Sequence, residues 1–161
     1  MKYAFQSCLL ILLAGILHSC STGSSTSESS SGPAPGGDYR NSKADIVVLS
    51  FFDMYCPHCQ RSAGDVNELY AMVQSRGKGR QIAFYAIGKN NSPMEAQLYQ
   101  KRYKVPFTVL PDKDLQISSR FSKVTPPMLI ALKKQGGTWQ EYYRVSKIEG
   151  NAAGIYPNIQ P

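Results

Sequence analysis

The stretch IVVLSFFDMYCPHC, residues 46–59, carries the strongest structural signal in the chain. Its first seven residues are nearly all apolar and rich in β-branched and aromatic side chains, which predicts a central strand buried on both faces. Beyond Cys59, apolar residues recur at the spacing expected of a half-buried helix, at Val66, Leu69, Tyr70 and Val73. The sequence therefore predicts a strand and a helix that meet at two cysteines.

Two cysteines separated by two residues at such a junction can close into a small disulfide and open again. Pro57 suits a first helical turn, whose free backbone N–H groups and positive dipole end would face Cys56 and favour its reactive thiolate. We therefore expect Cys56 to be the attacking sulfur and Cys59 to resolve the mixed disulfide. His58 is expected to favour the Cys56 thiolate and make the disulfide more oxidising, the alternative being an exposed spacer.

The rest of the chain alternates between strand and helix patterns. Strands are predicted at residues 81–87, 107–110, 128–132 and 139–145, with a turn at 135–137 before the last. Ser92, Pro93 and Glu95 form a capping-box pattern that predicts a helix fading near residues 103–104. A short helix is predicted from Leu115 to Phe121. Together these patterns indicate an α/β domain with a mixed sheet. Residues 146–161 lack the pattern of a long final helix, which leaves open what covers that side of the sheet.

The N-terminus is expected to be a targeting segment. Residues 1–19 have one lysine and a short apolar core, as in a secretory signal peptide, and Leu17-His18-Ser19-Cys20 resembles a bacterial lipobox. Cys20 would then carry the lipid, the alternative being an ordinary signal peptide with Cys20 left free. Residues 20–37 read as the lipidated cysteine and a flexible Ser/Gly linker, and residues 38–161 as the globular domain.

Composition narrows the possible partners. Once Cys8 is removed with the signal and Cys20 is acylated, Cys56 and Cys59 are the only thiols, so a catalytic pair is favoured over a structural disulfide framework. The net charge is +7, but the basic residues are dispersed, and we expect no nucleic-acid partner. We expect no metal and no cofactor other than the redox-active disulfide Cys56–Cys59. Ser21, where some bacteria place an inner-membrane retention aspartate, favours the outer membrane.

Taken together, residues 44–146 resemble the thioredoxin fold, in which a buried strand leads into an aromatic residue plus CxxC and a later proline precedes a strand. The resemblance implies a cis-proline packed against the CxxC loop, assigned to Pro126 with Thr125 before it; Pro127 is the alternative. It also implies a shallow apolar client groove formed by Met54, Tyr55 and the 125–126 strand start. The strand and helix between 81 and 104, an extra insertion, are most similar to the TlpA/ResA-like redoxin branch.

The resemblance implies an extracytoplasmic, membrane-anchored thiol–disulfide oxidoreductase, with a reductase favoured. Its clients would be protein thiols and disulfides, such as those of apocytochrome c, and a membrane redox partner would recharge it. The Pro-His dipeptide between the cysteines instead resembles DsbA-type oxidases, so an oxidase or isomerase is the alternative. Ser50 stands where related proteins often carry a buried carboxylate or amide, which argues against an internal proton acceptor for Cys59.

Three other classes of protein are compatible with fewer of these residues. A thiol peroxidase would need threonine or serine three residues before the reactive cysteine, where this chain has Asp53. After removal of the signal, His58 is the only histidine, so a Cu(I)-binding module would depend on Cys56 and Cys59, with Met54 as a further ligand. This set allows at most a two-coordinate Cu(I) site. A redox-inert anchored module remains the fourth reading.

Overall fold

The computed structural model describes residues 37–161. The predicted signal peptide, Cys20 and nearly all of the predicted linker lie outside the described residues. Within residues 37–161, no helix is both long enough and apolar enough to span a membrane.

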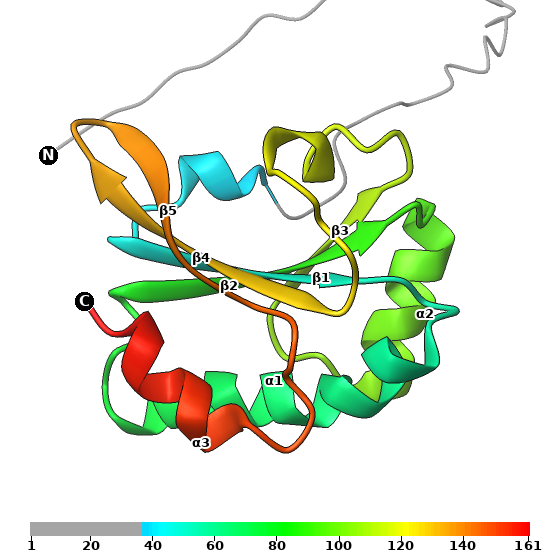
Figure 1. Cartoon of the computed structure of the whole chain (residues 1–161), viewed down its shortest axis with the longest axis horizontal. Coiled ribbons are helices and arrows are strands. Elements are labelled where there is room, and N and C mark those ends of the chain that lie inside the picture. The colour runs from blue at the N-terminus through cyan, green and yellow to red at the C-terminus, as the bar shows by residue number, and fades with distance from the viewer. Residues whose placement is uncertain (1–36) are drawn as a thin grey trace, which may run out of the picture. The chain divides into compact units, whose positions relative to one another are not determined.

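A five-stranded mixed sheet forms the centre of the domain (Figure 1). Its strands are β1 (Ile46–Phe52), β2 (Ile82–Lys89), β3 (Thr108–Asp112), β4 (Met128–Gln135) and β5 (Thr138–Val145), and their order is β3-β2-β1-β4-β5. β1, β2 and β3 run parallel, whereas β4 and β5 are antiparallel to their neighbours. All seven residues of β1 are buried, as the apolar run predicts for a central strand.

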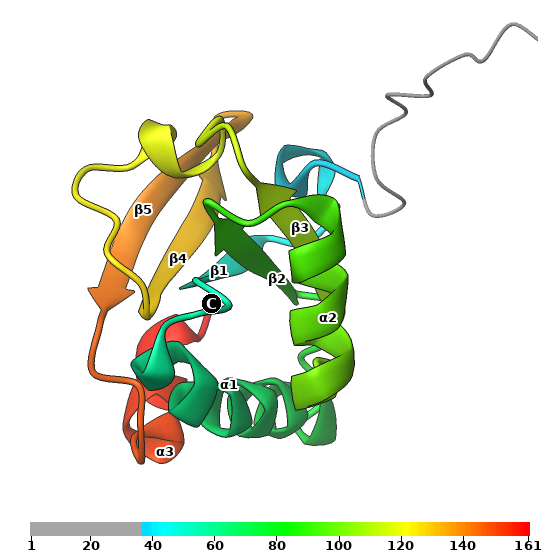
Figure 2. The same ribbon diagram turned by 90° about the vertical axis from the view of Figure 1, so that its right-hand side faces the viewer.

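Three helices lie on one face of this sheet (Figure 2). They are α1 (Pro57–Ser75), α2 (Pro93–Tyr103) and the short α3 (Ala152–Ile155). The opposite face is covered by a 3₁₀ turn at Tyr39–Asn41 and by side chains of the 113–127 segment. The predicted α/β class and mixed sheet flanked by helices are confirmed, and the strand and helix expected between residues 81 and 104 are β2 and α2.

The local signals at the helix starts were accurate. α1 begins at Pro57 with Cys56 as its N-cap residue, and α2 begins at Pro93 with the full capping box between Ser92 and Glu95. These starts could be predicted because capping and the N-terminal preference of proline depend on residues within one turn.

The predicted helix from Leu115 to Phe121 was wrong. The structure has only a 3₁₀ turn at Ser118–Arg120, and Leu115 adopts a left-handed backbone with φ 58°. The left-handed backbone at Leu115 interrupts the helical path at the first residue of the predicted segment. The buried carboxylate of Asp112 then fixes the loop by accepting hydrogen bonds from the backbone N–H groups of Ile117 (2.8 Å) and Ser118 (2.9 Å).

The last sixteen residues cover the side of the sheet that the sequence left open. After β5 the chain crosses to α1 and ends in α3 and a 3₁₀ turn at Tyr156–Ile159. No long final helix forms, as predicted. Buried side chains nevertheless join α1 to this segment, and they include Ile148, Ala152, Ile155, Tyr156 and Ile159.

Candidate active site

The two cysteines lie where β1 gives way to α1. Cys56 occupies the N-cap position with extended backbone, and its side chain is partly exposed. Its N–H donates to the Asp53 carbonyl (3.1 Å) and its carbonyl accepts from Gln60 N–H (3.1 Å), which fixes the turn. Cys59, one helical turn later, is only 1% exposed. Both are free thiols in this structure. The pair therefore consists of one reachable and one sheltered sulfur.

The environment of Cys59 strongly favours its protonated form. Burial above all, and then the nearby Cys56 side chain and Asp53 carboxylate, raise the pKa of the Cys59 thiol to about 12. The backbone N–H of Asp53 donates to the Cys59 sulfur at 3.4 Å, which acts in the opposite direction. Ser50, the β1 residue that replaces the expected carboxylate, is itself buried. In this state Cys59 is a poor nucleophile compared with an exposed thiol.

Three residues of the β2–α2 region hold the CxxC turn and the loop before it, and the sequence did not indicate that they belong to the site. Asn91 accepts a hydrogen bond from Met54 N–H (2.9 Å), and Glu95 accepts one from the Tyr55 hydroxyl (2.7 Å). The Tyr99 hydroxyl donates to the Cys59 carbonyl (3.1 Å). The Tyr99 ring also stacks on Phe52, with ring centroids 3.7 Å apart.

Glu95 has two roles that the sequence suggested only in part. Its capping of α2 was predicted, but its bond to Tyr55 was not. The Ser92 backbone N–H and then the Tyr55 hydroxyl lower the pKa of Glu95 to about 2. An ionised Glu95 thus links the α2 N-terminus to the residue that precedes Cys56. Burial also raises the pKa of the Tyr99 phenol.

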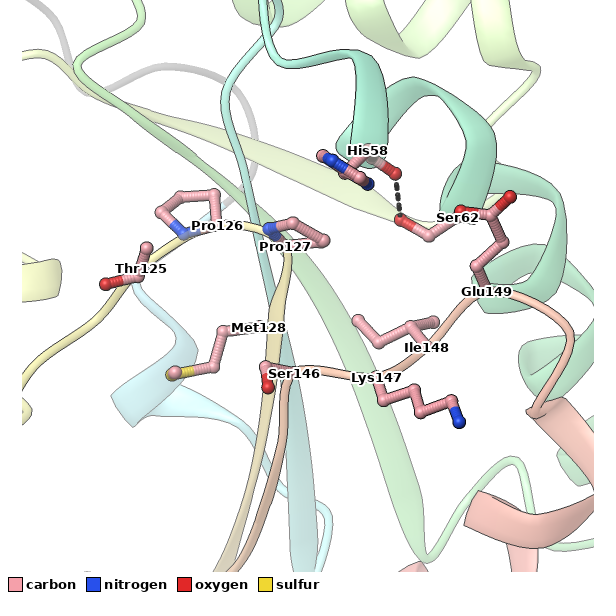
Figure 3. A pocket seen from close by; sticks show the side chains of 10 residues that line it. All are labelled: His58, Ser62, Thr125, Pro126, Pro127, Met128, Ser146, Lys147, Ile148 and Glu149. Carbon is pink, nitrogen blue, oxygen red and sulfur yellow. Dashed lines mark hydrogen bonds between the residues drawn. The ribbon is translucent and has the colours of Figure 1, made fainter.

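A pocket of about 430 Å³ opens beside the CxxC turn (Figure 3). It is lined by His58 and Ser62 of α1, by residues 125–128 and by residues 146–149. Thr125 and Pro126 line it as predicted for a client groove. Met54 and Tyr55 do not line this pocket, because their hydrogen bonds hold them toward α2 instead. The rest of the pocket lining comes from residues 146–149, after β5, which the sequence did not indicate.

The assignment of the cis-proline to Pro126 was wrong, and the alternative, Pro127, is correct. The cis peptide bond joins Pro126 to Pro127, directly before β4. Adjacent prolines give the same local sequence pattern in either register, so residue pattern alone could not separate them. The residue before the cis-proline is thus Pro126, which has a carbonyl but no N–H to offer, and not Thr125.

Two basic side chains hold the segment that leads to these prolines. Lys89, at the end of β2, donates to the Val124 carbonyl (2.6 Å). Arg144 of β5 donates to the Ser122 carbonyl (2.5 Å) and pairs with Glu141 (2.7 Å). The proline side of the pocket is therefore anchored to both β2 and β5.

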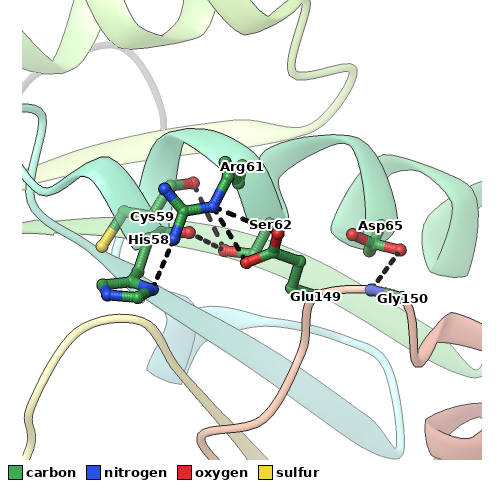
Figure 4. A network of polar contacts seen from close by, with 7 residues as sticks. All are labelled: His58, Cys59, Arg61, Ser62, Asp65, Glu149 and Gly150. Atoms are coloured by element: carbon green, nitrogen blue, oxygen red, sulfur yellow. Dashed lines mark hydrogen bonds and ion pairs between the residues drawn. The ribbon is translucent and has the colours of Figure 1, made fainter.

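On the other side of the pocket, a polar network joins α1 to the C-terminal segment (Figure 4). Arg61 contacts His58 Nδ1 at 2.7 Å, and its Nε lies 3.1 Å from each carboxylate oxygen of Glu149. One turn further along, the Asp65 carboxylate accepts from Gly150 N–H (3.1 Å). The i, i+3 spacing of His58 and Arg61 on a predicted helix could have suggested their contact, but nothing in the sequence pointed to Glu149.

The described residues provide no group of three or more His, Cys, Asp or Glu side chains that could hold a metal ion. What the site offers chemically is a dithiol: an accessible sulfur at a helix N-terminus, a buried sulfur beside it, and an open pocket whose lining includes prolines and a histidine.

Comparison with known proteins agrees with this geometry. The model of the AhpC/TSA family matches residues 36–147. The thiol-disulfide oxidoreductase ResA of Halalkalibacterium halodurans is 26% identical over 90 residues, which cover 56% of this chain and 49% of that protein. The chain therefore spans about half the length of the curated relatives it matches.

Solved structures show the same fold at low sequence identity. A secreted disulfide oxidoreductase of Mycobacterium tuberculosis, described as homologous to DsbE of E. coli, superposes with a TM-score of 0.57 at 18% identity, covering 71% of this chain and 80% of its own. StoA of Bacillus subtilis superposes with a TM-score of 0.58 at 16% identity, covering 73% and 84%. At these identities the likeness establishes the fold.

Proposed function

This chain belongs to the AhpC/TSA family, and we propose that it is a thiol–disulfide oxidoreductase that exchanges disulfides with client proteins through Cys56 and Cys59. The observation that carries the proposal is the asymmetry of the pair. Cys56 is partly exposed at the first turn of α1, whereas Cys59 is buried one turn later. An exchange enzyme needs both, because one sulfur must reach the client and the other must wait until the mixed disulfide has formed.

In the reducing direction, the Cys56 thiolate attacks one sulfur of a client disulfide, and the other client sulfur leaves as a thiolate. Cys59 then loses its proton and attacks the Cys56 sulfur, so that the second client thiolate leaves and the Cys56–Cys59 disulfide closes. Two electrons pass to the client, and the client sulfurs take up the two protons of the dithiol. Each further turnover needs two electrons from a reductant, which we propose is a membrane-bound thiol donor.

The remaining parts of the proposal rest on sequence and family likeness. We propose a reductase, because the resemblance of the sequence to the TlpA/ResA-like branch implies one. We also propose that the domain lies outside the cytoplasm, where the expected lipid anchor at Cys20 would hold it. Protein disulfides, including those of apocytochrome c, are the proposed clients. Residues 146–149 and 125–128 would receive the client chain, because together with His58 and Ser62 they line the pocket beside the pair.

The test is a disulfide-exchange assay on the full chain, with reduction of insulin disulfides by dithiothreitol as the readout. We expect Cys56→Ser to abolish the exchange. Cys59→Ser should instead accumulate a mixed disulfide with the client through Cys56, detectable as a mass increase that dithiothreitol reverses. Retained exchange in Cys56→Ser would contradict the assignment of the attacking sulfur.

The direction is tested by the reduction potential of the pair in glutathione and dithiothreitol buffers. A reductase should lie near the value of thioredoxin, about −270 mV, whereas an oxidase should approach that of DsbA, about −120 mV. A peroxide-consumption assay separates the thiol peroxidase reading. We expect no consumption above that of Cys56→Ser.

A further inference from the structure

An exposed apolar surface adjoins Cys56 on the side of α2. Of the four large apolar side chains that are exposed in the described part of the chain, three lie here: Tyr55 (67%), Met94 (72%) and Leu98 (47%). Met94 and Leu98 are about one helical turn apart in α2, so their side chains share one face of that helix. Tyr55 directly precedes Cys56 and reaches the first turn of α2 through its hydroxyl, which donates to Glu95. We call Tyr55, Met94 and Leu98 the α2 patch.

The α2 patch and the pocket lie on opposite sides of the start of α1. α2 packs on the β2 and β3 side of the sheet, whereas residues 146–149, which line the pocket, follow β5 at the other edge. Figure 2 shows α2 and the segment after β5 on the two sides of α1. None of the three patch residues lines the pocket. The α2 patch thus offers a partner a surface that a client chain in the pocket does not use.

The Tyr55 ring is held in place although it is exposed. Its hydroxyl donates to Glu95 at 2.7 Å, and its backbone N–H donates to the Asp53 carboxylate at 2.9 Å. Glu95 is fixed in turn by its capping box with Ser92. An aromatic ring that is fixed in advance loses little conformational freedom when a partner covers it, which favours association. Tyrosine is also enriched among the residues that contribute most to protein–protein binding.

The end of α2 beyond the patch is positively charged. Lys101 and Arg102 occupy the last turn, and both are exposed. They lie three and four residues after Leu98, so they continue the helix face that carries the patch. Within the described part of the chain, neither takes part in an ion pair. A partner that complements this face therefore carries apolar side chains followed by carboxylates.

The size and position of the α2 patch indicate a short-lived protein partner. Three partly exposed side chains supply only a fraction of the about 800 Å² per partner that a stable complex buries, which argues against a permanent dimer. Encounters between electron-transfer partners are characteristically smaller and weaker. A lipid surface over Tyr55 would cover the sulfur beside it, whereas a protein thiol has to reach that sulfur. The patch therefore suits a protein that meets Cys56 once in each turnover.

We propose that the α2 patch docks the thiol protein that reduces the Cys56–Cys59 disulfide, and that this donor carries apolar residues followed by carboxylates beside its reactive thiol. This inference deepens the proposed function and rests on it. The donor thiolate attacks the Cys56 sulfur, the Cys56–Cys59 bond breaks, and Cys59 leaves as a thiolate and takes up a proton. A second donor thiol then attacks the donor sulfur of the mixed disulfide, which releases Cys56 and closes a disulfide in the donor. The two electrons and two protons of the donor dithiol thereby pass to the pair.

The test measures how fast defined dithiol peptides reduce the disulfide of the oxidised full-length chain. The acidic probe is N-acetylated Cys-Gly-Gly-Cys-Gly-Leu-Ala-Phe-Glu-Glu. In the basic probe lysine replaces both glutamates, and in the polar probe serine replaces leucine and phenylalanine. The six residues after the second cysteine reach about 20 Å when extended, which is enough to follow the roughly 16 Å length of α2.

Samples are quenched with acid, labelled with N-ethylmaleimide and fragmented in the mass spectrometer, so that labels on Cys56 and Cys59 are counted apart from those elsewhere in the chain. Each rate is divided by that of dithiothreitol for the same variant, because so small a reductant needs no docking surface. This ratio separates docking from any change in the disulfide itself.

At low ionic strength the acidic probe should reduce the wild type about tenfold faster than the polar probe and about fivefold faster than the basic probe. The double variant Met94→Gln/Leu98→Gln should lose the first difference, and Lys101→Gln/Arg102→Gln should lose the second. These side chains are exposed and glutamine preserves helix propensity, so both variants are expected to fold. Salt at about 0.5 M should remove only the difference between the acidic and basic probes, because it screens exposed charges.

Two control variants remove the same kinds of group elsewhere. Tyr142→Thr removes the fourth exposed apolar side chain, on β5, and Lys133→Gln/Lys134→Gln removes two exposed charges at the end of β4 that pairs with the start of β1, away from the cysteines. Both should keep the wild-type differences between probes. The proposal is overturned if the acidic probe has no advantage in the wild type, or if its advantage over the polar probe survives Met94→Gln/Leu98→Gln.

Other occupants of the patch give different results. If this double variant abolishes a dimer seen in sedimentation, or binding to phosphatidylglycerol vesicles, then the patch serves a second copy of the chain or a membrane, and the proposal is wrong. Failure of the wild type to reduce insulin would overturn the proposed function. A chain that reduces insulin but does not distinguish the probes would overturn only the assignment of the α2 patch.

Discussion

Cys59 should stay protonated, and therefore unreactive, under conditions in which Cys56 is modified. Burial raises the pKa of the Cys59 thiol to about 12. At pH 8, four pH units below that value, about one Cys59 side chain in ten thousand is a thiolate. Since the thiolate is the species that alkylates, iodoacetamide should modify Cys56 at least about a thousandfold faster than Cys59. Raising the pH from 8 to 11 should speed Cys59 modification by roughly tenfold per unit.

The assay is timed alkylation of the reduced chain, followed by peptide fragmentation in the mass spectrometer to locate the label on Cys56 or Cys59. The control is the same reaction in urea at an unfolding concentration. Once unfolded, Cys59 regains the titration behaviour of an ordinary cysteine near pH 8.5, and the two thiols should react at similar rates. If Cys59 in the folded protein is labelled at pH 8 within about tenfold of Cys56, then burial does not protect it and the proposed division of roles is wrong.

Two stability predictions follow from the contacts. Ile155→Ala, at a position with 0% exposure, should destabilise the domain by about 2–5 kcal/mol in thermal or urea unfolding. Leu98→Ala, at a position 47% exposed on α2, should change the free energy of unfolding by less than about 1 kcal/mol. Equal destabilisation by the Ile155 and Leu98 variants would contradict the packing of α3. Hydrogen bonds to its carboxylate, chiefly from the Ser92 N–H, lower the pKa of Glu95 from 4.5 to about 2. The stabilisation of the folded state by ionised Glu95 is therefore present above pH 4.5 and is lost as the pH falls toward 2. Urea midpoints of Glu95→Gln should therefore fall less steeply than those of the wild type over that range, and parallel profiles would refute the role of the Glu95 carboxylate.

The parts of the fold that the sequence predicted depend on short-range patterns. The buried strand β1, the start of α1 at Pro57 and the capping box of α2 are each specified within a few residues. The cysteine pair was recognisable for the same reason. Its neighbours along the chain were enough to place it at a strand-to-helix junction.

The errors arose where a tertiary contact overrides a local pattern. Residues 115–121 looked helical, but Leu115 has a left-handed backbone and the Asp112 carboxylate fixes the loop through the amides of Ile117 and Ser118. The glycines and prolines of the final residues correctly argued against a long helix, but they left open what covers that side of the sheet. The final residues cover it themselves with a short helix and a 3₁₀ turn, because a few isolated apolar residues, such as Ile155 and Ile159, are buried completely. A helical periodicity test cannot detect a segment of four residues.

The site residues that the sequence missed are distant from the cysteines in the chain. Tyr99 lies 40 positions beyond Cys59, and its hydroxyl nevertheless donates to the Cys59 carbonyl. Glu149 lies 88 positions beyond Arg61 and orients it. Such pairs depend on how β2, α2 and the C-terminal segment return to α1. Secondary-structure patterns say which elements exist but not which side chains these elements bring to the same end of the sheet.

The dependence of the site on residues from distant segments also affects how a CPHC motif is interpreted. The dipeptide alone suggests an oxidising pair, because a charged histidine beside a thiolate stabilises the reduced form. Whether the histidine carries that charge depends, however, on what contacts its Nδ1 atom. Here that atom lies 2.7 Å from a terminal guanidinium nitrogen of Arg61, whose Nε contacts Glu149, a residue that is distant in the sequence but adjacent in the fold. The direction of exchange therefore has to be decided by the reduction potential of the Cys56–Cys59 pair, because the two residues between the cysteines do not determine it alone.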